Sequence, residues 1–190
     1  IHVASIKMNN KIKPEKIISK NLNITINLIK LLRINNFKKI INFSSSSLYP
    51  NIDGNFDEKK KINFINNTDY PYALSKYLTE RMLDLNFQKR KILHMRIVQI
   101  IGNNNDKTII SNIKRDVSNK NIIEIFGNGK RILNLIHIKK LIRYVKFATK
   151  SELHGIYNIG DYSLSLNKIA KIIKKKYGSK STKIILRNKL

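Results

Sequence analysis

The feature that most constrains the fold is the alternation of short apolar runs with longer amphipathic segments. Between Ile17 and Leu32 apolar residues recur at three- and four-residue spacing, which predicts a helix, and Pro14 suits its first turn. In chain order we expect strands at 1–4, 39–43, 91–101, 122–126, 133–138, 155–159 and 182–186, and helices at 17–32, 72–86, 108–117, 139–149 and 165–177. Strands that alternate with helices predict an α/β fold with a parallel sheet.

Composition limits the class of protein. The chain has 190 residues, enough for one full core and a small second lobe, and it contains no cysteine, which excludes disulfides and thiolate metal sites. No apolar run approaches the ~18 residues that span a bilayer, and no signal peptide is evident, so we expect a cytoplasmic protein with no membrane partner. The first residue is Ile1 rather than Met, and we interpret the chain as a fragment with its N-terminus upstream.

The formal net charge of +26 has two interpretations. A basic chain can bind a polyanion such as nucleic acid, and it attracts nucleotide-diphosphate ligands. Alternatively, abundant Lys, Asn and Ile reflect AT-rich coding. We favour the second interpretation, because the lysines are spread along the chain and are not interleaved with aromatic residues, so nucleic acid is not the expected partner.

The strongest chemical motif is the pair Tyr72 and Lys76, which follows Pro71 and the serine-rich run Phe43–Tyr49. Residues four apart on a helix share one face, so the two side chains lie one turn apart. A lysine ammonium beside a tyrosine favours the phenolate and lowers its pKa. A serine at the neighbouring strand end can hold the oxygen that Tyr72 protonates or deprotonates. The arrangement suits proton transfer on a sugar hydroxyl during hydride transfer.

In parallel sheets ligands bind at the carboxyl ends of the strands. Ser5, Ser45 and the end of the strand that reaches Val98 are all at such ends. The helix that begins near Tyr72 carries an apolar stripe of Leu74, Leu78, Met82 and Leu85.

Together these motifs resemble the extended short-chain dehydrogenase/reductase family, which comprises NAD-dependent sugar-nucleotide epimerases and dehydratases. Essentially the whole chain takes part in the resemblance. The similar segments are Ile1–Lys7 (fourth strand and cofactor-lining turn), Asn21–Leu28 (the Asn-Val-x-Gly-Thr-x-Asn-Leu helix, with Ile24 for glycine), Phe43–Tyr49 (serine strand), Tyr72 with Lys76, Met95–Gln99 with Gly102 (a strand end, with Gln99 for asparagine), Phe126–Gly129 and Ile136–Ile138.

The resemblance implies a role for each matching residue. Tyr72 would be the acid/base on the sugar, Lys76 would hold the nicotinamide ribose and lower the pKa of Tyr72, and Ser45 would bind the reacting oxygen. The residues implied in cofactor binding are Val3, Ala4, Ser5, Ile6, Lys7, Asn21, Ser45, Tyr72, Lys76 and Val98. Those implied in substrate binding are Ser45, Tyr72, Gln99 and Arg131.

The family also implies a domain organisation. Residues 1–102 would be the later part of an NAD-binding domain, a Rossmann-like doubly wound parallel sheet that lacks its first strands. Residues 103–190 would be mainly a small α/β lobe for the nucleotide-sugar, interleaved with the last Rossmann elements. The glycine-rich segment that binds the pyrophosphate is missing, so we expect this fragment alone to bind NAD poorly and to be inactive. The residue that selects NAD or NADP is missing too.

Departures from the family narrow the reaction. The 4,6-dehydratases of the family carry Asp-Glu after the catalytic Ser or Thr, whereas Ser46 and Ser47 follow Ser45 here. The cysteine of GDP-fucose synthases is replaced by Ser47. A 4-epimerase, which we favour, and a keto-sugar reductase remain. The arginine expected at Leu133 is absent, and Arg131 is the substitute we propose for the diphosphate.

Other interpretations stay open. One is a basic nucleic-acid-associated protein on a degenerate Rossmann-like fold, and another is an inactive, truncated relic. The family often forms homodimers through two helices, one of which carries the Tyr-x-x-x-Lys pair. We interpret His2, His137 and His94 as structural rather than metal-binding, and we expect His94 to have no carboxylate partner.

Overall fold

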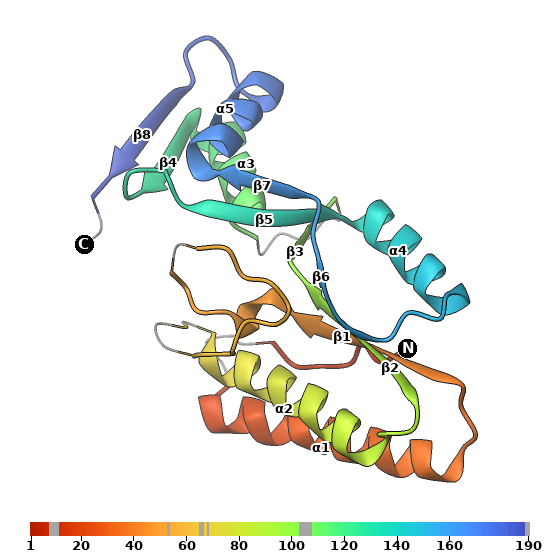
Figure 1. Ribbon diagram of the computed structural model, residues 1–190. Helices are drawn as coiled ribbons and strands as arrows, with labels where there is room; N and C mark the ends of the chain where they lie inside the picture. The colour runs from red at the N-terminus through yellow and green to blue at the C-terminus, as the bar shows by residue number, and fades with distance from the viewer. Residues whose placement is uncertain (8–11, 53, 65–66, 68, 103–107, 189–190) are drawn as a thin grey trace. The chain divides into compact units, whose positions relative to one another are not determined.

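Three parallel strands form the centre of the first of two units into which the computed structural model divides (Figure 1). The structure describes residues 1–7, 12–52, 54–64, 67, 69–102 and 108–188. The first unit comprises residues 1–98 and 142–159, and the second comprises residues 99–141 and 160–190.

The sheet of the first unit runs in the order β1 (Lys39–Ser45), β2 (Lys91–Ile97), β6 (Gly155–Ile159). All three strands are parallel, and Ser45, Ile97 and Ile159 are in register at their carboxyl ends. Of the predicted strand at 1–4, only His2 pairs, in a parallel bridge with Asn42 on β1. The parallel α/β arrangement predicted from the sequence is confirmed.

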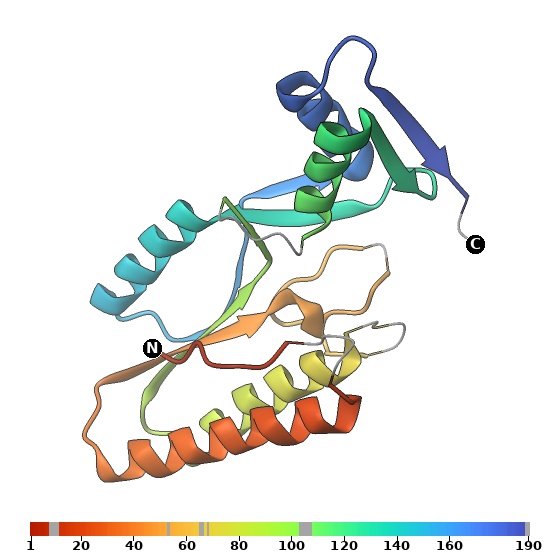
Figure 2. The same cartoon turned by 180° about the vertical axis from the view of Figure 1, so that it is seen from behind.

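Helices α1 (Pro14–Ile34) and α2 (Tyr70–Asn86) lie side by side on one face of this sheet (Figures 1 and 2). Helix α1 begins at Pro14 because a proline in the first turn lacks only an N–H that has no helical partner. The two helices are joined by a hydrogen bond of 2.8 Å between the buried hydroxyls of Thr25 and Thr79. An apolar cluster packs them on the sheet through Ile29, Ile40, Leu83 and Ile92.

Helix α2 buries a different face from the apolar stripe predicted for it. Its buried residues are Pro71, Ala73, Ser75, Lys76, Thr79, Glu80 and Leu83. Leu85 from the predicted stripe is 65% exposed. Polar side chains occupy the buried face because each finds a hydrogen-bond partner on α1 or on the sheet, which removes most of the penalty for burying them.

The second unit contains two sheets and two packed helices. One sheet has the order β3 (Gln99–Ile101), β5 (Ile132–His137), β7 (Tyr162–Ser165), and β7 is antiparallel to β5. The other pairs β4 (Ile122–Phe126) with β8 (Lys183–Arg187) in parallel. Helices α3 (Ile109–Lys120) and α5 (Leu166–Tyr177) share the core of this unit, whose buried members include Ile113, Val117, Ile123, Leu135, Ile169 and Ile173.

Two further features of the strands differ from the prediction. The run Lys91–Ile101 is not one strand, because it divides at Val98 into β2 and β3, which pair in different sheets. Strand β7 was not predicted, since Tyr162 and Ser163 are exposed and form no apolar run. The remaining elements are a 3₁₀ helix at Ser46–Leu48 and helix α4 (Ile138–Lys150), which follows β5 directly.

Within the described part of the chain, no helix has both the length and the apolar character needed to cross a membrane. Among those same residues, no group of three or more His, Asp or Glu side chains is placed to hold a metal ion.

Candidate active site

Ser45 is the last residue of β1, where the strand turns into the 3₁₀ helix. Its Oγ accepts hydrogen bonds from the Ser47 backbone N–H at 3.2 Å and from the Ser47 hydroxyl at 2.8 Å. A hydroxyl oxygen has two lone pairs, and Ser47 occupies both, so the Ser45 hydroxyl is left to act as a donor. The serine run therefore presents one hydrogen-bond donor at the carboxyl end of β1.

Tyr72 and Lys76 lie in the first two turns of α2, next to the end of β1. Lys76 is 4% exposed, and its Nζ donates to the Phe43 carbonyl oxygen at 2.6 Å. The same Nζ lies 5.8 Å from the centroid of the Tyr72 ring. The helical spacing predicted from the sequence is confirmed, and the lysine is anchored to the strand that carries Ser45.

Burial and nearby side chains shift the pKa of Tyr72 in opposite directions. Burial raises the pKa of Tyr72 above its ordinary value, and hydrogen bonds with the hydroxyls of Ser5 and Ser45 act in the opposite direction. The negative charge of Asp69 raises it further. The sequence led us to expect Lys76 to lower this pKa, but in the structure the contributions that lower it come from the two serines.

Burial lowers the pKa values of two basic side chains in this region, Lys76 and His2. Burial lowers the pKa of Lys76 to about 8, and the Glu80 carboxylate only partly opposes this shift. Burial, followed by the positive charge of Lys76, lowers the pKa of His2 to about 4, so this histidine is neutral at pH 7. The neutral His2, which is paired with β1, fits the structural role that the sequence suggested.

Asn21 holds the segment that follows His2. Its Oδ1 accepts from the Ile6 N–H at 2.6 Å, and its Nδ2 donates to the Ile6 carbonyl at 2.9 Å. Nδ2 also donates to the Ser75 hydroxyl at 2.9 Å, and Ser75 donates to the Tyr72 carbonyl at 2.8 Å. The side chain of Asn21 is thus occupied in positioning the turn, and its predicted contact with a cofactor stays a prediction.

The remaining residues of the predicted cofactor set are more open. Val3, Ala4 and Lys7 are exposed, and Ile6 is partly buried. The N–H of Val98 donates to the Ile159 carbonyl at 3.1 Å, which extends the pairing of β2 with β6. Their roles also stay predictions.

The residues predicted to contact substrate fall into both units. Ser45 and Tyr72 belong to the first unit, whereas Gln99 begins β3 and Arg131 immediately precedes β5 in the second. Arg131 is exposed, while Leu133 is buried in the core of the second unit. The structure therefore brings together Ser5, Ser45, Tyr72 and Lys76, and the roles of Gln99 and Arg131 stay predictions.

His94 has a carboxylate partner that the sequence did not reveal. Its Nε2 lies 3.0 Å from Asp84 Oδ1 on α2, and its Nδ1 lies 3.0 Å from Asn42 Nδ2 on β1. The expectation that no carboxylate lies near His94 is therefore wrong. The partner is ten residues away, on the preceding helix, and only the packing of α2 on the sheet brings it into contact. With both ring nitrogens occupied, the structural interpretation fits.

A buried ion pair joins helix α2 to strand β2 near the carboxyl end of the strand. Arg96 Nε and Nη2 donate to the two Glu80 carboxylate oxygens at 3.1 and 2.8 Å, and Nη1 donates to the Tyr49 hydroxyl at 3.0 Å. Although burial lowers the pKa of Arg96, the Glu80 carboxylate raises it by more, so the guanidinium stays charged. Sequence reasoning missed Glu80, whose only signal is its place one turn after Lys76.

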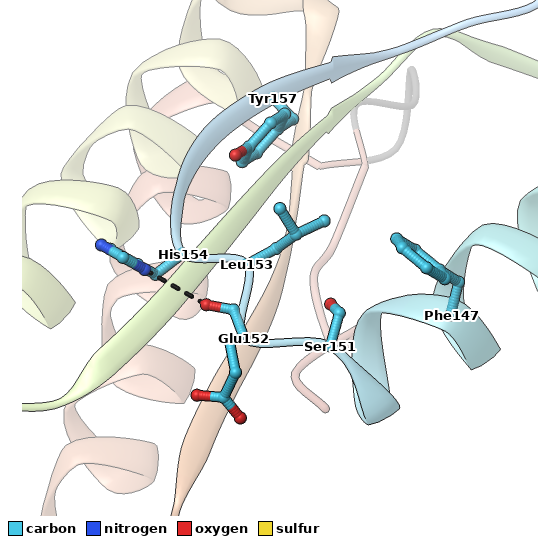
Figure 3. Close-up of a pocket in the computed structure, with 6 residues that line it drawn as sticks. All are labelled: Phe147, Ser151, Glu152, Leu153, His154 and Tyr157. Atoms are coloured by element: carbon cyan, nitrogen blue, oxygen red, sulfur yellow. Dashed lines mark hydrogen bonds between the residues drawn. The ribbon is translucent and has the colours of Figure 1, made fainter.

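An open hollow of about 490 Å³ lies elsewhere in the first unit (Figure 3). Tyr157 of β6, which lines this hollow, lies opposite Met95 of β2, and Met95 lies opposite Phe43 of β1. Gly155, where β6 begins, lies opposite Leu93 of β2. The hollow is therefore nearer the amino ends of the strands than Ser45 is. Parallel sheets bind ligands at the opposite ends, so we do not place the active site there. Its lining residues are Phe147, Ser151, Glu152, Leu153, His154 and Tyr157.

Solved structures share this fold. A UDP-N-acetylglucosamine 4-epimerase from Methanobrevibacter ruminantium M1, in complex with UDP-N-acetylmuramic acid, superposes with a TM-score of 0.85 at 20% identity, over 100% of this chain and 63% of that one. A UDP-glucuronic acid 4-epimerase from Bacillus cereus, in complex with NAD, gives 0.84 at 21%, over 97% and 61%. An NAD-dependent NDP-hexosamine 5,6-dehydratase involved in tunicamycin biosynthesis gives 0.83 at 17%, over 98% and 62%.

These likenesses confirm the Rossmann-like fold. The chain spans 61–63% of the length of those three structures. None of the curated proteins matches the chain. The model of the NAD dependent epimerase/dehydratase family matches residues 1–160, most of the chain. With the parallel sheet and the strand-end serine beside the Tyr-x-x-x-Lys helix, this match shows that the chain belongs to the NAD dependent epimerase/dehydratase family.

Proposed function

We propose that the protein is an NAD-dependent 4-epimerase of a nucleotide-activated sugar, with keto-sugar reduction as the related alternative. The observation that carries the proposal is the grouping of Ser45, Tyr72 and Lys76 at the carboxyl end of β1, where Lys76 Nζ donates to Phe43 of that strand and lies 5.8 Å from the centroid of the Tyr72 ring. An acid/base group beside a hydrogen-bond donor is what proton transfer at a sugar hydroxyl needs.

In the proposed mechanism Tyr72 moves the proton. As its phenolate, Tyr72 accepts the proton of the sugar hydroxyl while the carbon-bound hydrogen leaves as hydride. The Ser45 hydroxyl, which Ser47 orients as a donor, stabilises the resulting carbonyl oxygen. The hydride would return from bound NAD to the other face of the sugar, and Tyr72 would give its proton back to the sugar oxygen, which would complete the epimerisation. The proton and the two electrons are both restored, so the reaction has no net oxidation.

The residues present fit the part of NAD that reacts. Bound NAD supplies the hydride acceptor. Lys76 uses one of its three N–H donors on Phe43, and no second partner of Nζ is found within the described part of the chain, so donors remain for ribose hydroxyls. Val3 and Ala4, which are exposed, follow the pairing of His2 with β1, and we propose that they line the cofactor. NADP in place of NAD is not excluded by these residues.

The choice of reaction rests on the residues that follow Ser45. Elimination of water needs a general acid and a general base that titrate near the working pH, whereas Ser46 and Ser47 carry only hydroxyls, and Ser47 is used to orient Ser45. Two of the structurally similar proteins are 4-epimerases by name. The residues that follow Ser45 support epimerisation over dehydration, whereas the structurally similar proteins include a dehydratase as well as 4-epimerases. For substrate, we propose a nucleotide-diphosphate sugar whose diphosphate is met by Arg131, with Gln99 near the sugar.

The test is a comparison of Tyr72→Phe with the unaltered protein, each expressed from its complete reading frame. UDP-glucuronic acid and UDP-N-acetylglucosamine are supplied with NAD, and product epimers are separated chromatographically. Loss of the acid/base hydroxyl should reduce turnover by about 10²–10⁴-fold, because that is the usual contribution of such a group.

NAD binding, followed by isothermal titration, should be retained in Tyr72→Phe, since the ring and Lys76 remain. Turnover equal to that of the unaltered protein would overturn the acid/base assignment. A product lacking one water would identify a dehydratase instead.

A further inference from the structure

The Arg96 guanidinium connects helix α2 with the turn that follows β1. On one side Nε and Nη2 donate to the two carboxylate oxygens of Glu80, at 3.1 and 2.8 Å. On the other side Nη1 donates to the Tyr49 hydroxyl at 3.0 Å. Arg96 is 2% exposed and Glu80 is 1% exposed. Because the three donating nitrogens belong to one rigid, planar group, the guanidinium fixes the positions of Glu80 and Tyr49 relative to each other.

Tyr49 is held from a second side by strand β6. Its hydroxyl donates to Asn158 Oδ1 at 2.8 Å. Asn158 is itself fixed, because its N–H donates to Glu58 Oε1 at 2.7 Å and its Nδ2 donates to the Phe56 carbonyl at 3.0 Å. The rings of Phe56 and Tyr49 also pack together, with centroids 5.4 Å apart. The Tyr49 hydroxyl is thus a fixed point between β2 and β6.

Glu80 lies on the same helical face as the proposed acid/base. Tyr72, Lys76 and Glu80 follow one another at four-residue spacing on α2, so they share that face. Lys76 ties the face to β1, since its Nζ donates to the Phe43 carbonyl at 2.6 Å. The bidentate pair of Glu80 with Arg96 ties it to β2, one turn further along the helix.

Tyr49 closes the segment Ser45–Tyr49, which we call the serine turn. Its N–H donates to the Ser46 carbonyl at 3.1 Å, across the 3₁₀ helix that begins directly after Ser45. Within the turn, Ser47 donates its N–H and its hydroxyl to Ser45 Oγ at 3.2 and 2.8 Å. Strand β1 fixes one end of the serine turn, and the Tyr49 side chain fixes the other.

We propose that Arg96 and Tyr49 are positioning residues, which together hold the serine turn in place relative to the face of α2 that carries the acid/base. This inference rests on the proposed function. Neither residue exchanges a proton in the reaction. Their role is to keep the Ser45 hydroxyl where the reacting oxygen of the sugar needs a donor, because a displacement of about 1 Å at such a group can cost 10²-fold in rate.

The test separates the link to the serine turn from the buried ion pair. Tyr49→Phe removes one hydroxyl and keeps the pair of Glu80 with Arg96, so the chain should still fold. Arg96→Lys keeps a positive charge beside Glu80, but an ammonium lacks the planar fork that serves both partners, so it should act in the same way. Tyr157→Phe is the matched control, because Tyr157 also lies on β6 but lines the hollow nearer the amino ends of the strands (Figure 3).

The first readout is amide hydrogen exchange, resolved by residue with NMR. The Ser47 N–H should exchange about tenfold faster or more in Tyr49→Phe and in Arg96→Lys, because the serine turn has lost its anchor. The Phe43 N–H is the internal reference. It donates to the His2 carbonyl at 2.9 Å on β1, and its exchange should stay the same, which shows that only the turn has loosened.

The second readout is turnover of the two UDP-sugars with NAD. Tyr49→Phe should lower kcat roughly tenfold or more, while KM for the sugar nucleotide changes less than about threefold. When Ser45→Ala is already present, adding Tyr49→Phe should cause less than about a twofold further loss, because the hydroxyl that Tyr49 positions is gone. A merely structural role would lower kcat equally in both backgrounds.

Exchange of the Ser47 N–H that Tyr49→Phe leaves unchanged would overturn the proposal, and so would an equal loss of kcat with and without Ser45. The exchange measurement needs neither turnover nor NAD. If Tyr72→Phe abolishes turnover while Tyr49→Phe alters neither exchange nor kcat, only the positioning role fails. If the unaltered protein converts neither sugar, the proposed function fails, and faster exchange in Tyr49→Phe still establishes that Tyr49 anchors the serine turn.

Discussion

At the scale of the residue, the site combines buried charges with few compensating partners. Lys76 is the clearest case, since burial lowers its pKa from 10.5 to about 8. In the unfolded chain the ordinary pKa applies, so between these two values the unfolded state binds more protons than the folded state. Stability therefore rises with pH across this window, and the full penalty for the buried charge is present below about pH 8.

The first prediction concerns that penalty. As the pH rises from 8 to 10.5, the unaltered chain should gain stability relative to the Lys76→Met variant. The expected gain in free energy of unfolding is up to about 3 kcal/mol. Urea denaturation at several pH values measures it. Lys20→Met, at an exposed position of α1, is the control and should show no such rise. A difference that is flat with pH would contradict the burial of a charged Lys76.

The second prediction concerns the pair of Glu80 and Arg96, whose side chains are 1% and 3% exposed. Glu80→Ala leaves the guanidinium buried without its counter-charge, so it should lower the free energy of unfolding by about 3–5 kcal/mol. The neighbouring pair of Arg81 and Asp84 is 50% and 33% exposed, and Arg81→Ala should change stability by less than about 1 kcal/mol. Equal effects of the two substitutions in chemical denaturation would refute the contrast.

At the scale of the element, strand ends depend on glycine where two strands approach. Gly102 follows β3 with φ of +89°, and a Cβ there would lie 2.3 Å from Nε2 of His137 at the end of β5. Gly127, after β4, has a similar φ of +85° but nothing within 4 Å of its would-be Cβ. Substitutions at these two glycines therefore distinguish the cost of backbone strain, which both would have, from the cost of a steric clash, which only Gly102 would have.

The third prediction uses this pair. Gly127→Ala should cost about 1–3 kcal/mol of unfolding free energy for the left-handed backbone alone. Gly102→Ala should cost roughly 1–3 kcal/mol more, because His137 must also be displaced. Denaturation of both variants under the same conditions gives the difference. A smaller loss for Gly102→Ala than for Gly127→Ala would show that His137 moves away without penalty.

At the scale of the whole molecule, charge is the dominant feature. A net charge of +26 on 190 residues destabilises a compact state through self-repulsion. The ion pairs found among the described residues are few, so screening should weaken repulsion more than attraction.

The fourth prediction follows from that balance. The Tm of the chain should rise as ionic strength increases from about 0.02 to 0.2 M, a range in which the Debye length falls to below about 10 Å. NaCl and KCl should act alike, because screening does not depend on the identity of the ion. A Tm that falls with salt in both would mean that attractive ion pairs outweigh the repulsion.

Local patterns in the sequence were sufficient for most elements and for the Tyr72–Lys76 pair. Pro14 begins α1, Ser165 caps α5 by accepting from the Lys168 N–H, and β4 and β6 have the predicted bounds. The reason is that a cap, a first-turn proline and an apolar run act through residues within about one turn or one strand. The spacing of Tyr72 and Lys76 is likewise a property of a single helix.

Only the tertiary structure decided which partners meet. It divided Lys91–Ile101 between two sheets, placed Asp84 against His94 and buried Glu80 with Arg96. It also joined Asn21 to the Ile6 backbone and to Ser75, and it turned Lys76 toward Phe43. These contacts join residues that are distant in sequence, and their geometry depends on how helices pack on a sheet. The sequence by itself determined the elements and the chemical groups, and the packing determined how those groups act on one another.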